Sequence, residues 1–195
     1  LWSVDDPNLY WVKTEIIQGS KVIDTLDTRF GIRYLYLKPG TFDEAYSEEN
    51  TLGGLFINGE YTRINGMCEH RDLGALGMET YQAAIDRRIR KLKSMGVNVV
   101  RCAHDPVSPE YIEAADRLGM LIFEEGFDQW IKAKNSDDYH NYFNKAEDGT
   151  TTVFEYSGAD GPDTYIRWVN PDLKPNCVRD IQAMVDRDKN SPSIF

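Results

Sequence analysis

Apolar and polar positions alternate with a period of two in the first part of the chain. Residues 10–16 follow this pattern, Gly19 and Ser20 offer a turn, and residues 22–26 begin a second extended run. A period of two predicts β-strands, so these residues predict a β-hairpin. A further strand is predicted from Arg29 to Leu37. The acidic, apolar-poor stretch after it, residues 41–54, predicts a connector that contains a domain boundary.

Beyond this connector the pattern alternates between strands and helices. A short hairpin is predicted around Asn58 and Gly59, because both residues of such a turn tolerate positive φ. Three strands are predicted next, at residues 67–70, 97–102 and 120–123. The last two are almost continuously apolar, which is typical of strands buried on both faces. A fourth strand is predicted to begin at Pro192.

Helical spacing predicts a first helix after the strand at residues 67–70. Its apolar positions lie four, four and three residues apart, at Tyr81, Ile85, Ile89 and Leu92. Thr80 is the predicted N-cap and Gly96 the predicted stop. The mixed charges of residues 86–93 predict a solvated helix face.

Two more helices are predicted by the same spacing. Ser108 is the expected N-cap of the second helix, with Pro109 at its first position and Gly119 closing it. Val178 and Val185 mark the apolar side of the third helix. Residues 126–170 between these helices lack a sustained period and predict a long insertion, of the kind that carries function or surrounds a ligand site.

The alternation of strands and helices predicts an α/β fold with a parallel sheet and right-handed crossovers. A doubly wound sheet and a (β/α)₈ barrel both fit this order. No Gly-x-Gly-x-x-Gly follows any predicted strand, so the dinucleotide-binding version of the doubly wound sheet is not favoured. The pattern alone leaves the two architectures open.

Composition narrows the classes of partner. The chain has 195 residues and a formal net charge of −10, so its surface repels phosphate backbones and anionic lipids, and we expect neither nucleic acid nor membrane as a partner. No apolar run approaches the roughly 20 residues of a membrane-spanning helix. The three cysteines form no C-x-x-C pair, which predicts neither a disulfide framework nor a thiolate zinc site. The compartment stays open between cytoplasmic and secreted or periplasmic.

Ionisable residues follow three consecutive predicted strands. The first strand ends at His70, His104 follows the second strand, and Glu124 and Glu125 follow the third, with charged neighbours beside each histidine. Ligands meet parallel sheets at the carboxyl ends of their strands, so the two imidazoles are expected to converge on one ligand. The two glutamates leave an extended chain on opposite faces and do not form one acid/base pair. No residue spacing nominates a metal site.

Arg101 ends the second of these strands and has two interpretations. It contacts substrate, or it is the structural ion-pair partner of a carboxylate in an acidic protein. Aromatic residues of the insertion, Trp130 among them, have two interpretations as well, because aromatic faces stack on sugar rings and also hold long loops together.

Several segments in order carry a resemblance to one enzyme family. These are GMCEHRDLGALG at residues 66–77, KSMGVNVVRCAH at 93–104, EGFDQW at 125–130 and DRDKNSPSI at 186–194. Together they resemble glycoside hydrolase family 2, most closely its β-galactosidase branch. LWS at residues 1–3, PNLY at 7–10 and FGIR at 30–33 are similar to the last strands of the immunoglobulin-like domain that precedes the catalytic barrel in this family.

The resemblance implies a fold and a division of the chain. Residues 1–48 are expected to end an immunoglobulin-like β-sandwich, and residues 49–195 to form the first half of a (β/α)₈ TIM barrel. The implied activity is retaining hydrolysis of β-glycosides by two glutamates about 5 to 5.5 Å apart. Both glutamates are expected after Phe195, so the segment alone is expected to contain no catalytic residue and to be inactive.

Roles of individual residues follow from the resemblance only. His70 and His104 are expected to contact the sugar, Arg101 and Asp128 to form the wall of the site, and Trp130 to bind substrate. No cofactor and no metal are implied. The expected partner is a β-galactoside or a related oligosaccharide, and a homo-oligomer is compatible with the full-length protein.

Two alternatives stay open at this point. The chain is a non-catalytic carbohydrate-binding or structural module, or it belongs to a β-glucuronidase or β-mannosidase of the same family.

Overall fold

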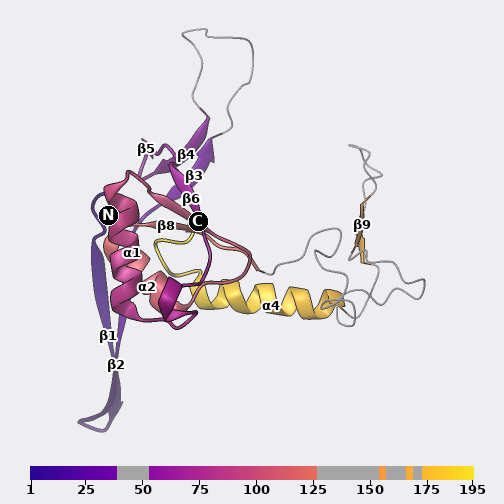
Figure 1. Ribbon diagram of the computed structural model, residues 1–195. Coiled ribbons are helices and arrows are strands. Elements are labelled where there is room, and N and C mark those ends of the chain that lie inside the picture. Colours follow the sequence, from indigo (N-terminus) through magenta and orange to yellow (C-terminus); the bar gives the residue numbers. More distant parts are fainter. Residues whose placement is uncertain (39–52, 127–153, 157–165, 169–172) are drawn as a thin grey trace. The chain divides into compact units, whose positions relative to one another are not determined.

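The computed structural model describes residues 1–38, 53–126, 154–156, 166–168 and 173–195 (Figure 1). Two compact units result, one formed by residues 1–125 with 188–195, the other by residues 126–187. The second unit contains a short antiparallel pair, β9 (Phe154–Tyr156) and β10 (Ile166–Trp168), and helix α4 (Leu173–Asp188). The third predicted helix is therefore present. No helix in the described ranges is long and apolar enough to cross a membrane.

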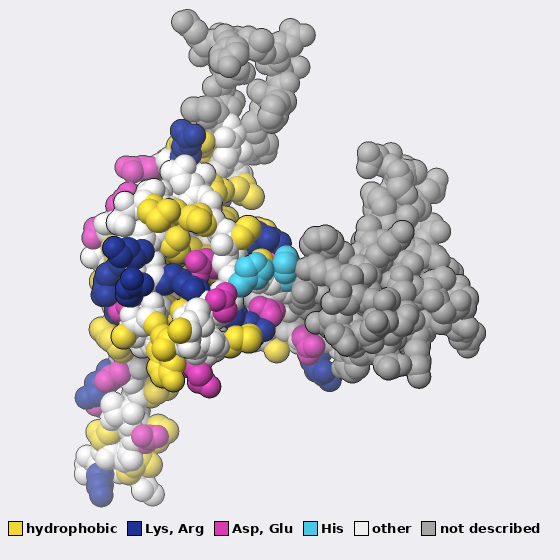
Figure 2. Space-filling model, viewed as in Figure 1, with side chains coloured by type: hydrophobic (Ala, Val, Ile, Leu, Met, Phe, Trp, Pro, Cys, Tyr) yellow, Lys and Arg dark blue, Asp and Glu magenta, His cyan; other side chains and the backbone are white. Residues whose placement is uncertain are grey.

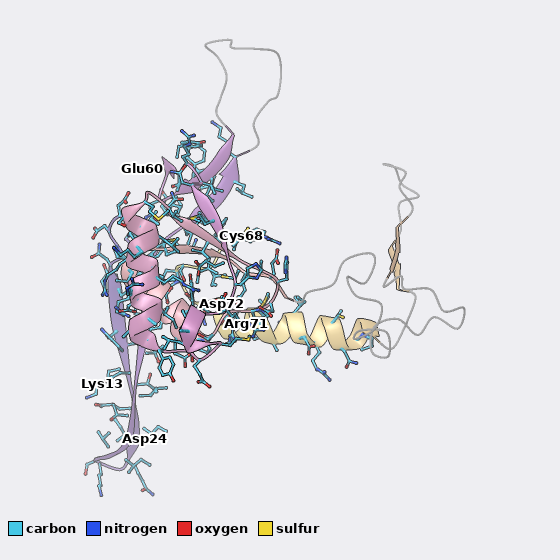
Figure 3. The ribbon with its side chains drawn as sticks, in the orientation of Figure 1. Lys13, Asp24, Glu60, Cys68, Arg71 and Asp72 are labelled. Carbon is cyan, nitrogen blue, oxygen red and sulfur yellow. The ribbon has the colours of Figure 1, made fainter. Side chains whose placement is uncertain are left out.

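The predicted N-terminal hairpin is confirmed. β1 (Leu9–Gln18) pairs antiparallel with β2 (Lys21–Gly31) from end to end. Gly19 takes a φ of 65° in the connecting turn, a value that glycine adopts without a steric penalty. Lys13 and Asp24 project from this hairpin away from the rest of the first unit (Figure 3).

The strand predicted from Arg29 to Leu37 is divided in two. β2 ends at Gly31, and β3 (Leu35–Lys38) then pairs with β4 (Gly54–Ile57) in another sheet. The physical reason lies at Gly31 and Arg33. A Cβ atom on Gly31 would meet the Pro192 ring at 2.5 Å, and Arg33 Nε donates to the carbonyl oxygen of Pro192 at 2.5 Å.

The predicted hairpin around Asn58 is confirmed and is shorter than expected. β4 pairs with β5 (Glu60–Tyr61), and the turn between them has positive φ at both Asn58 (53°) and Gly59 (90°). β3 and β4 come from opposite sides of the connector and share this three-stranded sheet. The position of a domain boundary between residues 48 and 49 stays a prediction.

A parallel sheet forms the centre of the first unit. Its strands are β6 (Gly66–Glu69), β7 (Val99–Cys102) and β8 (Leu121–Phe123), in that spatial order. Ile194 makes a parallel bridge to Ile122, so the chain after Pro192 occupies a fourth strand position of the sheet, next to β8. A short 3₁₀ helix (Gly74–Leu76) and α1 (Gln82–Ser94) follow β6, and α2 (Pro109–Leu118) follows β7 (Figure 1).

Alternate residues of these strands serve two different cores. Val100, Cys102 and Ile122 pack with Ile85 and Ile89 of α1 and with residues of α2, on the helix side of the sheet. Val99 and Leu121 point to the other face, where they pack with Trp2, Leu55 and Ile57. Both faces are covered at Val99, Val100, Leu121 and Ile122, which explains why β7 and β8 are apolar at these positions.

The caps of the two helices differ from each other. Ser108 caps α2 as predicted, because its side chain accepts a hydrogen bond from the Tyr111 amide, and Gly119 ends the helix in the left-handed region. The predicted N-cap Thr80 is wrong. The N-cap of α1 is Tyr81, which makes no side-chain capping bond.

The solvated face predicted for residues 86–93 is also wrong in part. Asp86 is mostly buried and accepts a hydrogen bond from Arg117 of α2 at 2.7 Å. Lys93 Nζ donates to the carbonyl oxygens of Val4 and Leu118, both at 2.6 Å. Asp86 and Lys93 therefore link α1 to its neighbours, although the charged residues 86–93 look solvated in the sequence.

Candidate active site

Two imidazoles meet at the carboxyl ends of β6 and β7. His70 directly follows β6, and His104 lies two residues after β7. Their ring centroids are 5.8 Å apart with an interplanar angle of 63°, and Figure 2 shows the histidines as a single patch on the surface. His70 is exposed and His104 half-buried. The structure thus brings together the two histidines that the sequence places at neighbouring strand ends.

An ion pair joins the same two loops. Arg71 follows His70, Asp105 follows His104, and Arg71 Nη2 contacts Asp105 Oδ2. Arg71 and Asp72 lie in the loop that continues β6 beyond Cys68 (Figure 3). The side chains of Arg71 and Asp105 are partly exposed, so the pair holds the two loops together while it stays accessible to solvent.

Arg101 is engaged by a carboxylate of the next strand end. Its Nε and Nη2 atoms donate to Glu125 Oε1 at 2.8 and 2.5 Å, and its Nη1 atom lies 3.5 Å from Cys68 Sγ. These contacts raise the pKa of Arg101. Of the two interpretations of Arg101, the structure shows the ion pair. The arginine lies on the sheet face opposite to the helices, together with Val99.

The two neighbouring glutamates have different partners, as their alternation predicts. Glu125 contacts Arg101, whereas Glu124 Oε1 accepts a hydrogen bond from the Val107 amide at 3.1 Å. Glu124 thereby fixes the loop that leads from β7 into α2. The two carboxylates do not form one acid/base pair.

Sequence reasoning missed a half-buried ion pair directly behind His70. Glu69 points to the helix side of the sheet, and its Oε2 atom accepts a hydrogen bond from Arg88 Nη1 at 2.9 Å. Burial raises the pKa of Glu69, and the positive charge of Arg88 opposes this effect. The signal was available, because Arg88 lies three residues after Ile85 and one before Ile89, next to the buried stripe of α1.

The edge as a whole carries more negative than positive groups. The described strand ends contribute five carboxylates and two arginines: Glu69, Asp72, Asp105, Glu124 and Glu125, with Arg71 and Arg101. The imidazoles beside them are groups that form hydrogen bonds with hydroxyls. Within the described ranges no cluster of His, Cys, Asp and Glu has the arrangement of a metal site. The described strand ends thus combine hydrogen-bonding imidazoles with an excess of carboxylates.

Asp128 and Trp130, the other two predicted site residues, lie outside the described residues. Their predicted roles as a site-wall residue and a substrate-binding residue stay predictions.

The strand order, the helices on one face and the polar strand ends define part of a TIM barrel. Residues 51–195 match the family described as "Glycosyl hydrolases family 2, TIM barrel domain", and residues 1–33 match "Glycosyl hydrolases family 2". The chain belongs to glycosyl hydrolase family 2.

Curated relatives of the chain carry two different activities in their names. A β-galactosidase of Bacteroides ovatus is 32% identical over 100% of this chain, which corresponds to 18% of that protein. A putative β-glucuronidase of Formosa agariphila is 31% identical over 100% of this chain and 15% of that protein. The chain thus spans less than a fifth of the length of these relatives.

Solved structures agree with the fold. A glycosyl hydrolase family 2 member from Bacteroides cellulosilyticus has a TM-score of 0.68 and 33% identity, and a β-glycosidase from Bacteroides vulgatus has a TM-score of 0.70 and 28% identity. Each match covers 100% of this chain and 20% of the solved chain.

Proposed function

We propose that this chain is the sugar-recognising first part of the catalytic barrel of a retaining β-glycosidase that acts on neutral β-glycosides, in the first place β-galactosides. The observation that carries the proposal is the pair of imidazoles at the ends of β6 and β7, 5.8 Å apart. In a partial TIM barrel this edge is where the substrate meets the protein. His70 and His104 are assigned to hydrogen bonds with sugar hydroxyls, and Arg101 to the wall of the site.

The charge of the edge supports a neutral sugar over a uronic acid. Arg71 and Arg101 are the cations of the described strand ends, and each contacts a carboxylate of the chain itself, Asp105 and Glu125 respectively. A uronate would have to compete with these carboxylates for the guanidinium groups. It would also meet the repulsion of the remaining acidic side chains.

β-Glucuronidase activity is the second candidate. It is favoured by the putative β-glucuronidase among the relatives, whose identity to the chain nearly equals that of the β-galactosidase. On this reading Arg71 exchanges Asp105 for the substrate carboxylate. Because Arg71 is partly exposed, such an exchange requires no unfolding of the loop.

Turnover is assigned to the longer protein. Retaining hydrolysis needs an acid/base and a nucleophilic carboxylate about 5–5.5 Å apart, and we place both after residue 195. His70, His104 and Arg101 then supply binding and orientation, which lower the barrier only in combination with those carboxylates.

The experiment is a substrate panel on the full-length protein that contains this chain. Initial rates with 4-nitrophenyl β-galactoside, β-glucuronide and β-mannoside are compared at equal concentration. The proposal expects the galactoside to have the highest kcat/KM. A glucuronide preference establishes the second candidate, and no release of nitrophenol from any of the three contradicts a β-glycosidase.

The variant Asp105→Asn further distinguishes a preference for galactosides from a preference for glucuronides. Removing this carboxylate frees the Arg71 guanidinium, so the ratio of glucuronide to galactoside kcat/KM is expected to rise about tenfold, the effect of one surface-accessible charge contact. Glu60→Gln, on the exposed strand β5, is the matched control and should leave the ratio unchanged.

A further inference from the structure

Arg88 reaches from the middle of α1 to three groups at the end of β6 and in the segment that follows it. Its Nη1 atom donates to Glu69 Oε2 at 2.9 Å and to the carbonyl oxygen of His70 at 3.2 Å. Its Nη2 atom donates to the carbonyl oxygen of Asp72 at 2.5 Å. One guanidinium group thus binds the backbone on both sides of Arg71, at the carbonyl oxygens of His70 and Asp72.

Little else fixes this segment to the helix layer. Residues 70–81 are exposed apart from Leu73, which is half-buried and packs against the core between the sheet and the helices. A segment with few buried side chains owes its position to its polar contacts. On the side of β7 the segment is held by the Arg71–Asp105 ion pair and by the Ala103 amide, which donates to the Glu69 carbonyl oxygen at 3.0 Å. On the side of the helices, the hydrogen bonds from Arg88 hold the His70 backbone.

The environment of the guanidinium group is not that of a surface charge. The side chains of Arg88 and Glu69 retain 25% and 17% of their exposure. Near them lies Tyr111, whose hydroxyl is buried and whose pKa is raised by burial and then by the charge of Glu69. Removing Arg88 would leave the half-buried Glu69 carboxylate without its counter-charge.

We infer that Arg88 is a positioning residue of the sugar-binding edge. Arg88 pairs with Glu69 and donates hydrogen bonds to the carbonyl oxygens of His70 and Asp72, and these contacts together fix the position of the His70 imidazole. This inference rests on the proposed function, because it takes His70 to contact the sugar. Arg88 itself lies on the helix side of the sheet and touches no ligand.

The shape of the guanidinium group makes a specific demand. A planar fork donates several hydrogen bonds in fixed directions, whereas a lysine ammonium group is a compact charge on a flexible stem. Lysine at position 88 keeps the charge beside Glu69 and does not hold both carbonyl oxygens at once. Arg88→Lys is therefore expected to separate charge compensation from positioning.

The test is a double-mutant cycle in the full-length enzyme with Arg88→Met, His70→Ala and the double variant. The measured quantity is the dissociation constant of galactose, or of glucuronate if the substrate panel prefers the glucuronide, by isothermal titration calorimetry. Each single variant is expected to weaken binding about tenfold, and in the His70→Ala background the Arg88 substitution is expected to add less than about twofold. Arg88→Lys should fall between wild type and Arg88→Met.

A control variant and a second readout separate positioning from general destabilisation. Arg87→Met changes the neighbouring, exposed arginine of α1 and should leave the dissociation constant unchanged. The midpoint of thermal unfolding is measured for every variant. Loss of Arg88 should lower it by the same amount in both backgrounds, because the half-buried Glu69 loses its partner in each.

The outcomes distinguish this inference from the proposed function. If His70→Ala leaves sugar binding unchanged, the sugar-contact role of His70 fails and the inference is overturned with it. If His70→Ala weakens binding and Arg88→Met does not, or if the two effects multiply fully in the double variant, the positioning role alone is overturned. Non-additive losses with Arg88→Lys in between support it.

Discussion

The β1–β2 hairpin and the parallel sheet β6–β7–β8 both contain large apolar side chains and differ in how far these side chains are buried. The hairpin strands have 10 and 11 residues and pair along their whole length, yet Trp11 and Leu26 remain 65% and 64% exposed. The sheet strands have four residues or fewer, and Val100 and Ile122 are fully buried. Long pairing alone therefore does not produce a core. The sheet has a core on each face because α1 and α2 cover one face, and Trp2, Leu55 and Ile57 cover the other.

The largest expected effect tests this difference directly. Ile122→Ala in β8 removes a side chain enclosed between the sheet and the helices, so we expect a loss of about 2–5 kcal/mol in the free energy of unfolding. Ile23→Ala in the exposed hairpin should change it by less than about 0.5 kcal/mol. Urea unfolding of the 195-residue chain measures both. Equal losses would show that the hairpin carries as much of the core as the sheet.

A smaller effect concerns the two helices that cover the sheet. Ser108→Ala removes the side-chain cap of α2 and should cost about 1 kcal/mol of unfolding free energy. Thr80→Ala should cost much less, because the N-cap of α1 is Tyr81 and makes no capping bond with its side chain. The same urea titrations compare the two variants. A larger loss for Thr80→Ala would instead identify Thr80 as the N-cap of α1, as the sequence pattern predicts.

The smallest expected effect on stability concerns Asp116 of α2. Asp116 of α2 accepts hydrogen bonds from the Ser193 amide at 3.0 Å and from the Ser191 hydroxyl, and Trp2 Nε1 donates to its backbone oxygen at 2.8 Å. Burial raises the pKa of Asp116, against the lowering effect of these serines. The ionised carboxylate is therefore less favourable in the folded chain than in the unfolded one.

The sign of the resulting pH dependence follows from linkage. A carboxyl with a raised pKa stabilises the fold fully below its unfolded pKa of about 3.9, and this contribution is lost as the pH rises through the raised folded pKa. Asp116→Asn keeps an oxygen acceptor and removes the charge. Urea titrations between pH 4 and 7 should show the stability of the variant rising relative to that of wild type. A difference that is constant with pH would contradict the raised pKa.

The sequence pattern predicts the parts of the fold whose signals are local. The spacing of Ile85 and Ile89, the cap at Ser108 and the turn at Asn58-Gly59 all depend on neighbours within a few residues, and the structure confirms them. The convergence of His70 and His104 also follows from the sequence, because neighbouring parallel strands bring their carboxyl ends together.

What the sequence does not predict depends on contacts between distant segments. The end of β2 at Gly31 is set by Pro192, which lies far along the chain. Lys93 belongs to a helix whose charges look solvated, and its partners include the backbone carbonyl oxygens of Val4 and Leu118, which no side-chain pattern records. The partner of Arg101 was left open for the same reason, because only the register of β7 with β8 places Glu125 beside it.

The central claim is that the edge formed by the ends of β6 and β7 binds the sugar, and His104 tests it most directly. In the full-length enzyme, His104→Ala is expected to raise the inhibition constant of galactose, or of glucuronate if that sugar is preferred, about tenfold, as loss of one hydrogen bond of about 1.4 kcal/mol predicts. The melting midpoint should stay near that of wild type because His104 lies outside both cores. An unchanged inhibition constant in a folded variant would contradict the claim.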